Sequence, residues 1–204
     1  ISPQTETKRI YPDEPNTIVK SSHSVKLDVA QPLFLLGFKD TDVGYDGYKL
    51  LKKEIIISLL MEILFGRSST IYEELYEAGL IDDRFSFSYE GQKDYGFCTI
   101  GGESRDPEKL YEILIESIEQ AKQKGIEFDD FERVKKKFHG NYIQGFNSLD
   151  FIATNFITYH HKNISIFDYI KALNEIKIED LNKRLKEFFD LNRCATSTVM
   201  PKSK

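Results

Sequence analysis

Several features that would mark a secreted or membrane protein are scarce or missing in this sequence. Its 204 residues include no Trp and two Cys, Cys98 and Cys194, which are too few for a disulfide framework and typical of a reducing compartment. The longest apolar run, Ile55 to Phe65, is interrupted by polar residues and is shorter than the roughly 20 residues that span a bilayer. The opening ISPQTETKRIYPDEPNT has no apolar central region, so it predicts no signal peptide. We therefore expect a cytoplasmic protein with no membrane partner.

An excess of positive charge is also missing. The chain has 28 Lys and Arg against 33 Asp and Glu, which gives a formal net charge of −5. A dedicated nucleic-acid binder would carry a basic excess, so nucleic acid is not an expected partner. The 40% hydrophobic and 30% charged content is that of an ordinary globular protein, and the length is enough to bury a core.

Motifs for hydrolytic or phosphate chemistry are absent from the sequence as well. Zinc peptidases need two histidines one helical turn apart with a glutamate that activates metal-bound water, and none of His23, His139, His160 and His161 has such neighbours. There is no P-loop, no G-x-G-x-x-G and no G-x-S-x-G. We predict that this chain alone catalyses nothing and holds no cofactor or metal.

The chain divides into a short opening segment and one long folded region. Residues 1–16 hold three prolines and mixed charge without periodicity, which is typical of a linker. Residues 17–204 show no repeat and no low-complexity tract, so a single domain is the simplest prediction.

Hydrophobic periodicity predicts the order of helices and strands in that domain. A half-buried strand is expected at 25–29, a central strand apolar on both faces at 32–38, and an alternating strand at 85–89 that forms a hairpin with YGFCTIGG. RCATSTVMP reads as a last strand. Helices are expected at 45–65, 70–78, 107–124, 129–161 with a break near GFNSLD, 166–176 and 179–188. Because strands come in pairs separated by helices, the predicted class is α+β, with an antiparallel sheet covered by helices on one face.

The turn between the second helix and the alternating strand is unusually rich in signals. In SSTIYEELYEAGLIDDRFSFSY, Thr70 and Glu73 have capping-box spacing, and Gly79 stands where a left-handed residue ends a helix. Two acids and an arginine, Asp82, Asp83 and Arg84, then follow before the strand begins.

The region LFGRSSTIYEELYEAGLIDDRFSFSYEGQKDYGFCTIGGESRDPEKLYEIL resembles the C-terminal half of the insulinase/pitrilysin zinc peptidases, the group of the mitochondrial processing peptidase. The likeness is closest to bacterial YmfH-type members, whose helix also ends in LYxxGLID. In weaker form it extends to QPLFLLGFKD and STVMP, so it covers most of the chain. The succession of helix, Gly-Leu turn, hairpin and Asp-Pro helix is fairly specific.

This resemblance implies the fold of one half of a LuxS/mitochondrial processing peptidase-like metallohydrolase. In the family, the N-terminal half carries the zinc motif H-x-x-E-H, and the two halves enclose a chamber for peptides. The expected partner is therefore a zinc-bearing homologous half or subunit, with zinc in that partner and none here. The expected substrates are peptides or small unfolded proteins.

The sequence departs from the active members of the family at two positions. These members place an arginine and a tyrosine in this half, in a pattern like L-R-E…G-L-x-Y. Here Tyr76 stands in the arginine's place, and Ile81 to Phe85, where the tyrosine would fall, contain none. We hypothesise that Tyr76, Asp82, Asp83 and Arg84 contact peptide in the chamber. A solvated turn with a local Asp–Arg pair is the alternative for this site. For the whole chain, the alternative is an inactive scaffold or interaction protein.

Overall fold

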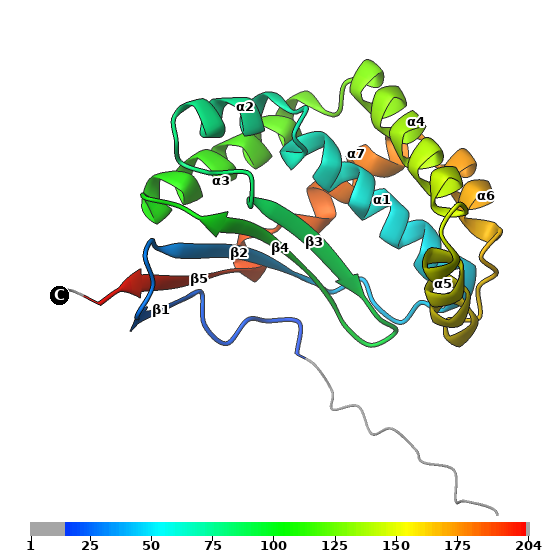
Figure 1. Cartoon of the computed structure of the whole chain (residues 1–204), viewed down its shortest axis with the longest axis horizontal. Coiled ribbons are helices and arrows are strands. Elements are labelled where there is room, and N and C mark those ends of the chain that lie inside the picture. The colour runs from blue at the N-terminus through cyan, green and yellow to red at the C-terminus, as the bar shows by residue number, and fades with distance from the viewer. Residues whose placement is uncertain (1–14, 203–204) are drawn as a thin grey trace, which may run out of the picture.

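The computed structural model describes residues 15–202 (Figure 1). The predicted linker, residues 1–16, lies outside the described residues except for Pro15 and Asn16, which belong to no helix or strand. The assignment of residues 17–204 to a single domain stays a prediction.

Five strands form one sheet in the order β1-β5-β2-β4-β3. Their bounds are β1 (Ser22–Leu27), β2 (Leu33–Asp40), β3 (Ser86–Gly91), β4 (Gly96–Glu103) and β5 (Cys194–Pro201). β2 pairs antiparallel with both β4 and β5, and β3 pairs antiparallel with β4. β1 departs from the predicted antiparallel pattern because it runs parallel to β5, which leaves β1 and β3 as the two edges.

Helices lie on one side of this sheet, which confirms the predicted α+β class (Figure 1). They are α1 (Gly47–Phe65), α2 (Thr70–Glu77), α3 (Pro107–Lys124), α4 (Phe128–Gly145), α5 (Leu149–His161), α6 (Asp168–Glu175) and α7 (Ile178–Phe188), with a 3₁₀ turn η1 at Leu191–Arg193. The break predicted near GFNSLD is the gap between α4 and α5, where the Ser148 hydroxyl accepts a hydrogen bond from the Phe151 amide.

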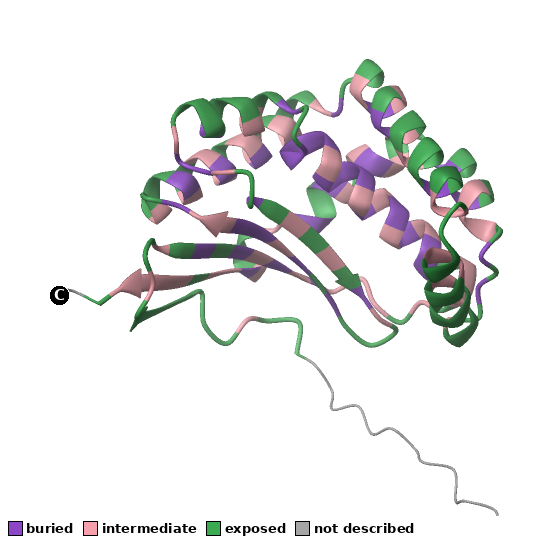
Figure 2. Ribbon diagram, viewed as in Figure 1, coloured by how far each residue is buried: buried purple, intermediate pink, exposed green. Residues whose placement is uncertain are grey.

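The core is built around α1, which lies between the sheet and the outer helices (Figures 1 and 2). Its second half is nearly all apolar, and Ile57, Leu59 and Leu60 are fully buried, as a helix covered on most sides requires. The sheet contributes Phe34, Leu36 and Phe38 from alternate positions of β2 to the same core.

The other face of β2 corrects the prediction that this strand is buried on both sides. Leu33 and Leu35 point away from the helices and are 37% and 46% exposed. β2 is central within the sheet, but no helix among the described residues covers its second face (Figure 1). We call this uncovered side of the sheet the open face.

Two further local predictions are corrected by the structure. β1 begins three residues before the predicted strand, and all six of its residues are exposed instead of half-buried. The N-cap of α2 is Ser69, whose hydroxyl accepts from the Tyr72 amide, so Thr70 and Glu73 form no capping box. Gly101 and Gly102 both lie inside β4, and Gly101 lets the neighbouring β2 backbone at Phe34 approach closely.

Candidate functional site

The predicted site begins at the turn after α2, and the structure shows why glycine stands there. Gly79 has a φ of +61°, its amide donates to the Tyr76 carbonyl, and the Leu80 amide donates to the Leu75 carbonyl. This is the paired hydrogen-bond pattern of a Schellman motif, in which a left-handed C′ residue ends the helix. The turn directs the chain from α2 toward β3, as the sequence predicts.

Arg84 lies between two carboxylates on different elements. Its Nη2 donates to Asp82 Oδ2 at 2.6 Å and to Glu103 Oε2 at 2.5 Å, while Nη1 donates to Glu103 Oε1 at 2.7 Å. The hydrogen bond from Arg84 holds the pKa of Asp82 below its usual value. The local Asp–Arg pair is therefore present, and it is extended by Glu103, which sequence reasoning missed because it belongs to another strand.

We call the turn that carries Tyr76, Asp82, Asp83 and Arg84 the Arg84 corner. Tyr76 and Asp83 are linked to it through other residues. Tyr76 is 54% exposed and stacks on Tyr72, whose ring also packs edge-on against Phe85 at the start of the β3 segment. Asp83 takes part through its carbonyl, which accepts a hydrogen bond from Arg67 at 2.9 Å. The four predicted residues thus lie along one turn, with Asp82 and Arg84 in contact and Tyr76 linked through aromatic rings. Their contact with peptide stays a prediction.

This corner opens onto the open face of the sheet. Glu103 alternates with the inward residues of β4 and lies opposite Leu33 of β2. Leu33 pairs in turn with Val199 of β5, and Val199 pairs with Val25 of β1. Three apolar side chains from three adjacent strands therefore lie side by side on the open face next to the Arg84 corner.

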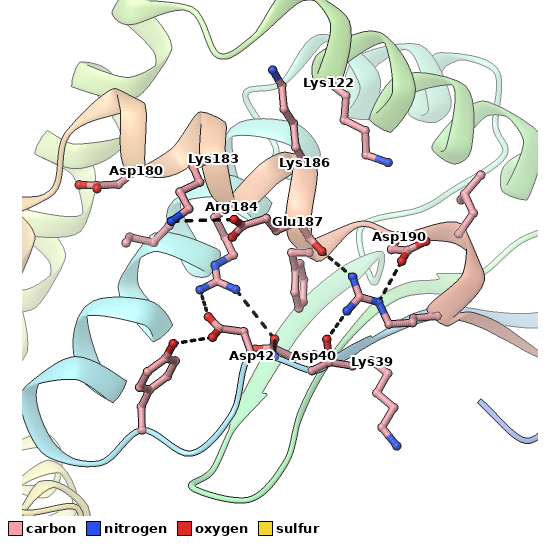
Figure 3. A pocket seen from close by; sticks show the side chains of 16 residues that line it. Lys39, Asp40, Asp42, Lys122, Asp180, Lys183, Arg184, Lys186, Glu187 and Asp190 are labelled. Atoms are coloured by element: carbon pink, nitrogen blue, oxygen red, sulfur yellow. Dashed lines mark hydrogen bonds and ion pairs between the residues drawn. The ribbon is translucent and has the colours of Figure 1, made fainter. Parts of the chain in front are cut away.

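A charged cleft of about 800 Å³ lies between the loop after β2 and α7, and the sequence predictions missed it (Figure 3). Arg184 of α7 forms an ion pair with Asp42 and lies 4.0 Å from Asp40. Asp42 also accepts a hydrogen bond from the Tyr45 hydroxyl at 2.5 Å. These contacts fasten α7 to the loop between β2 and α1.

The base of this cleft contains a buried ion pair. Asp40 and Lys53 are each 4% exposed, and Lys53 Nζ lies 3.0 Å from Asp40 Oδ2. The Tyr89 hydroxyl donates to the same carboxylate at 2.7 Å, and burial together with this carboxylate raises the pKa of Tyr89. Because the buried charges are matched to one another, we interpret the cleft as a structural anchor rather than as a reaction centre.

Within residues 15–202, no group of three or more His, Cys, Asp or Glu side chains could hold a metal ion. Cys98 and Cys194 are buried and unpaired, and burial raises their thiol pKa values to about 12 and about 11, as expected for inert core thiols. In the same part of the chain no single helix is long and apolar enough to cross a membrane, although α1 and α2 together, bent by 44°, have the required length and composition.

The fold agrees with one family. Residues 2–138 match the family model described as the peptidase M16 inactive domain. The chain belongs to this family. The predicted resemblance to insulinase/pitrilysin zinc peptidases is thereby confirmed.

Individual relatives give the same assignment. The chain is 34% identical over 200 residues to the zinc protease YmfH of Bacillus subtilis, covering 98% of this chain and 46% of that protein. It superposes with a TM-score of 0.91 on an M16-like peptidase from Alicyclobacillus acidocaldarius at 29% identity, covering 95% of this chain and 46% of that one. It also shares its fold with the inactive peptidase domain of a zinc protease from Bordetella parapertussis, at a TM-score of 0.70, 15% identity and coverages of 88% and 96%.

The coverages also show how much of each relative this chain corresponds to. The chain spans about half the length of YmfH and of the Alicyclobacillus peptidase, while it matches nearly all of the separate Bordetella domain. In those two relatives, the part that matches this chain is thus about half of the protein.

Proposed function

We propose that this chain is the non-catalytic half of a zinc peptidase and completes a peptide chamber with a zinc-bearing homologous half. The observation that carries the proposal is the open face, an apolar sheet surface that no described helix covers. Family membership and the twofold length of the relatives support a homologous second half.

One end of the open face is apolar, as contact surfaces often are. Val25, Leu33 and Val199 lie in register across β1, β2 and β5, and Leu27 pairs with Pro201 beside them. Contiguous exposed apolar side chains mark interaction surfaces more often than isolated ones. In the middle of the sheet the exposed Leu35 lies between Gly101 of β4 and Ser197 of β5, so small residues flank one apolar side chain and leave room for an extended peptide.

Helix α5 provides a second unpartnered surface. None of its residues is buried, and Leu149, Phe156 and Ile157 are 85%, 58% and 57% exposed. Its far end is tied to the body of the chain by Lys162, whose ammonium lies 2.7 Å from Glu54 and 3.3 Å from the Gly91 carbonyl. One side of α5 packs on the chain, since Phe151 lies against Tyr142 and Phe146 and Tyr159 packs against the core. A second half that covers its other, exposed apolar side chains would explain their position.

In this function the chain binds and orients peptide and excludes water, and it performs no bond-breaking step. Zinc, expected in the other half, would activate the attacking water. The residues here that face the substrate are those of the open face and of the corner formed by Tyr76, Asp82, Asp83 and Arg84. Tyr76 can donate one hydrogen bond but supplies no permanent positive charge, in contrast to the arginine of active relatives.

Cleavage of an unfolded fluorogenic peptide by the full-length protein tests the proposal. We expect cleavage that stops when a chelator removes zinc and returns when zinc is added. Leu33→Asp together with Val199→Asp should lower turnover by about tenfold or more, because charges on the open face disturb the positioning of the halves and the peptide. Val19→Asp is the matched control, since Val19 is 95% exposed and should tolerate the charge.

The second candidate is an inactive scaffold that keeps this fold and binds proteins without cutting them. The replacement of the family arginine by Tyr76 favours it. A full-length protein that contains zinc and binds unfolded peptides, yet cleaves none, would support the scaffold and contradict the peptidase. A cytoplasmic location remains a prediction for either candidate.

A further inference from the structure

A groove of about 840 Å³ runs along the helix side of the sheet, opposite the open face. Its floor is formed by the inward residues of β1 and β5, and one wall is formed by the first turns of α3. All residues of β1 are exposed, so this edge of the sheet extends beyond the helical layer (Figure 2). The groove lies on the opposite side of the sheet from the open face, and it shares Leu191 with the lining of the charged cleft of Figure 3.

The floor offers small hydroxyl groups in a regular array. Ser22 pairs with Thr196 and Ser24 pairs with Thr198 across the parallel strands. Within residues 15–202 the hydroxyls of Ser22, Ser24 and Thr198 have no hydrogen-bond partner, so they are available to a ligand. Four strand steps, from Thr196 to Met200, span about 13 Å, which suits an extended segment of four or five residues.

The α3 wall adds negative charge and an aromatic ring. Glu108 and Glu112 lie one helical turn apart and both are exposed, and neither has an ion-pair partner among the described residues. Like charges at this spacing repel each other, so a bound cation would relieve the repulsion. Tyr111 lies between them in the sequence and lines the same groove, where its ring can contact a cation or a peptide plane.

The one cation that lines the groove does not pair with these glutamates, and Lys109 of the same helix forms no ion pair with them among the described residues. Arg105 is the single Lys or Arg among the lining residues. Its guanidinium lies against Gly79, where a Cβ on the glycine would be 2.2 Å from Nη2, and so it is turned toward the α2–β3 turn. Asp106 is occupied as the N-cap of α3, since its Oδ1 accepts from the Lys109 amide at 3.1 Å.

We propose that this groove binds an extended peptide segment that carries Lys or Arg. The floor hydroxyls bond to the peptide backbone, Tyr111 packs against the chain, and Glu108 and Glu112 receive its basic side chains. The site is independent of the proposed chamber, because it lies on the other side of the sheet and needs no residue of the open face.

The test uses the full-length protein with a chelator present to prevent cleavage, and fluorescein-labelled Ala-Lys-Ala-Arg-Ala-Lys as the probe. Fluorescence anisotropy gives the Kd, and Glu108→Gln with Glu112→Gln should weaken binding about fivefold. Glu73→Gln with Glu77→Gln on α2 is the matched control, with the same charge change at the same helical spacing, and should leave the Kd unchanged. A probe with Glu in place of Lys and Arg should not bind.

Hydrogen exchange locates the bound probe independently of these variants. We expect slower amide exchange in β1, β5 and the first turns of α3 when the probe is present. Equal weakening by the two double variants, no binding of the basic probe, or protection confined to other elements would each overturn the proposal. Loss of zinc-dependent cleavage elsewhere in the protein would leave this result untouched, so the two proposals fail separately.

Discussion

The two faces of the sheet differ in how far their apolar side chains are buried. On the helix side, Phe34, Leu36 and Phe38 of β2 are buried in the core beneath the helical layer. On the open face, the intervening Leu33 and Leu35 remain exposed although they are equally apolar. No helix among the described residues covers this second face, which fits the proposal that another half of the protein packs on it.

The largest effect on the free energy of unfolding is expected from truncating a β2 side chain on the buried face. Phe38 is fully buried and packs edge-on against Phe189 at 5.1 Å, so Phe38→Ala should destabilise the chain by about 3–5 kcal/mol. Leu35→Ala on the open face should change the free energy of unfolding by no more than about 0.5 kcal/mol. Urea denaturation of both variants measures the contrast, and equal losses would show that Leu35 is packed within this chain.

A somewhat smaller loss is expected from the buried ion pair beneath the charged cleft. Lys53→Met leaves Asp40 with no adjacent ammonium at a site that is 4% exposed, so we expect a loss of about 3 kcal/mol. Arg84→Met breaks an exposed pair and should cost much less. Similar urea midpoints for the two variants would mean that Asp40 is solvated or protonated, which contradicts the anchor.

The smallest effect concerns pH. Burial acts to raise the pKa of Asp42, but hydrogen bonds from Tyr45 and Arg184 outweigh it and hold the pKa below its ordinary value of 3.8. The stability from this group is therefore fully present above pH 3.8 and is lost as the pH falls through the lower folded pKa. Between about pH 6 and pH 3, the free energy of unfolding should fall less steeply with decreasing pH for Arg184→Met than for the parent protein. The same pH dependence in both proteins would contradict the inference that Arg184 lowers the pKa of Asp42.

Sequence reasoning predicted the elements whose signals are local. The predicted bounds 107–124 of α3 are confirmed, because the signals that set them are local: Asp106 at the N-cap, Pro107 in the first turn and Gly125 at the C-cap. Gly79 ends α2 for the same reason.

The parts that were missed depend on distant partners. The ion pair between Asp42 and Arg184 joins residues that are 142 positions apart. No sequence spacing predicts which basic residue of a helix pairs with which acidic residue of a distant loop. Glu103 joins Arg84 only because β4 returns beside β3. The exposure of Leu33 and Leu35 could not be predicted either, since an apolar stretch looks the same whether this chain or another one covers it.

Labelling of a cysteine on α5 tests most directly whether a second half covers the unpartnered surfaces. Phe156→Cys and Lys136→Cys place thiols on two exposed positions, of α5 and α4, while Cys98 and Cys194 are buried. In the full-length protein, maleimide should react at position 156 about tenfold or more slowly than at position 136, as followed by mass spectrometry of each peptide. Equal rates would show that α5 stays bare in the whole protein and would contradict the account.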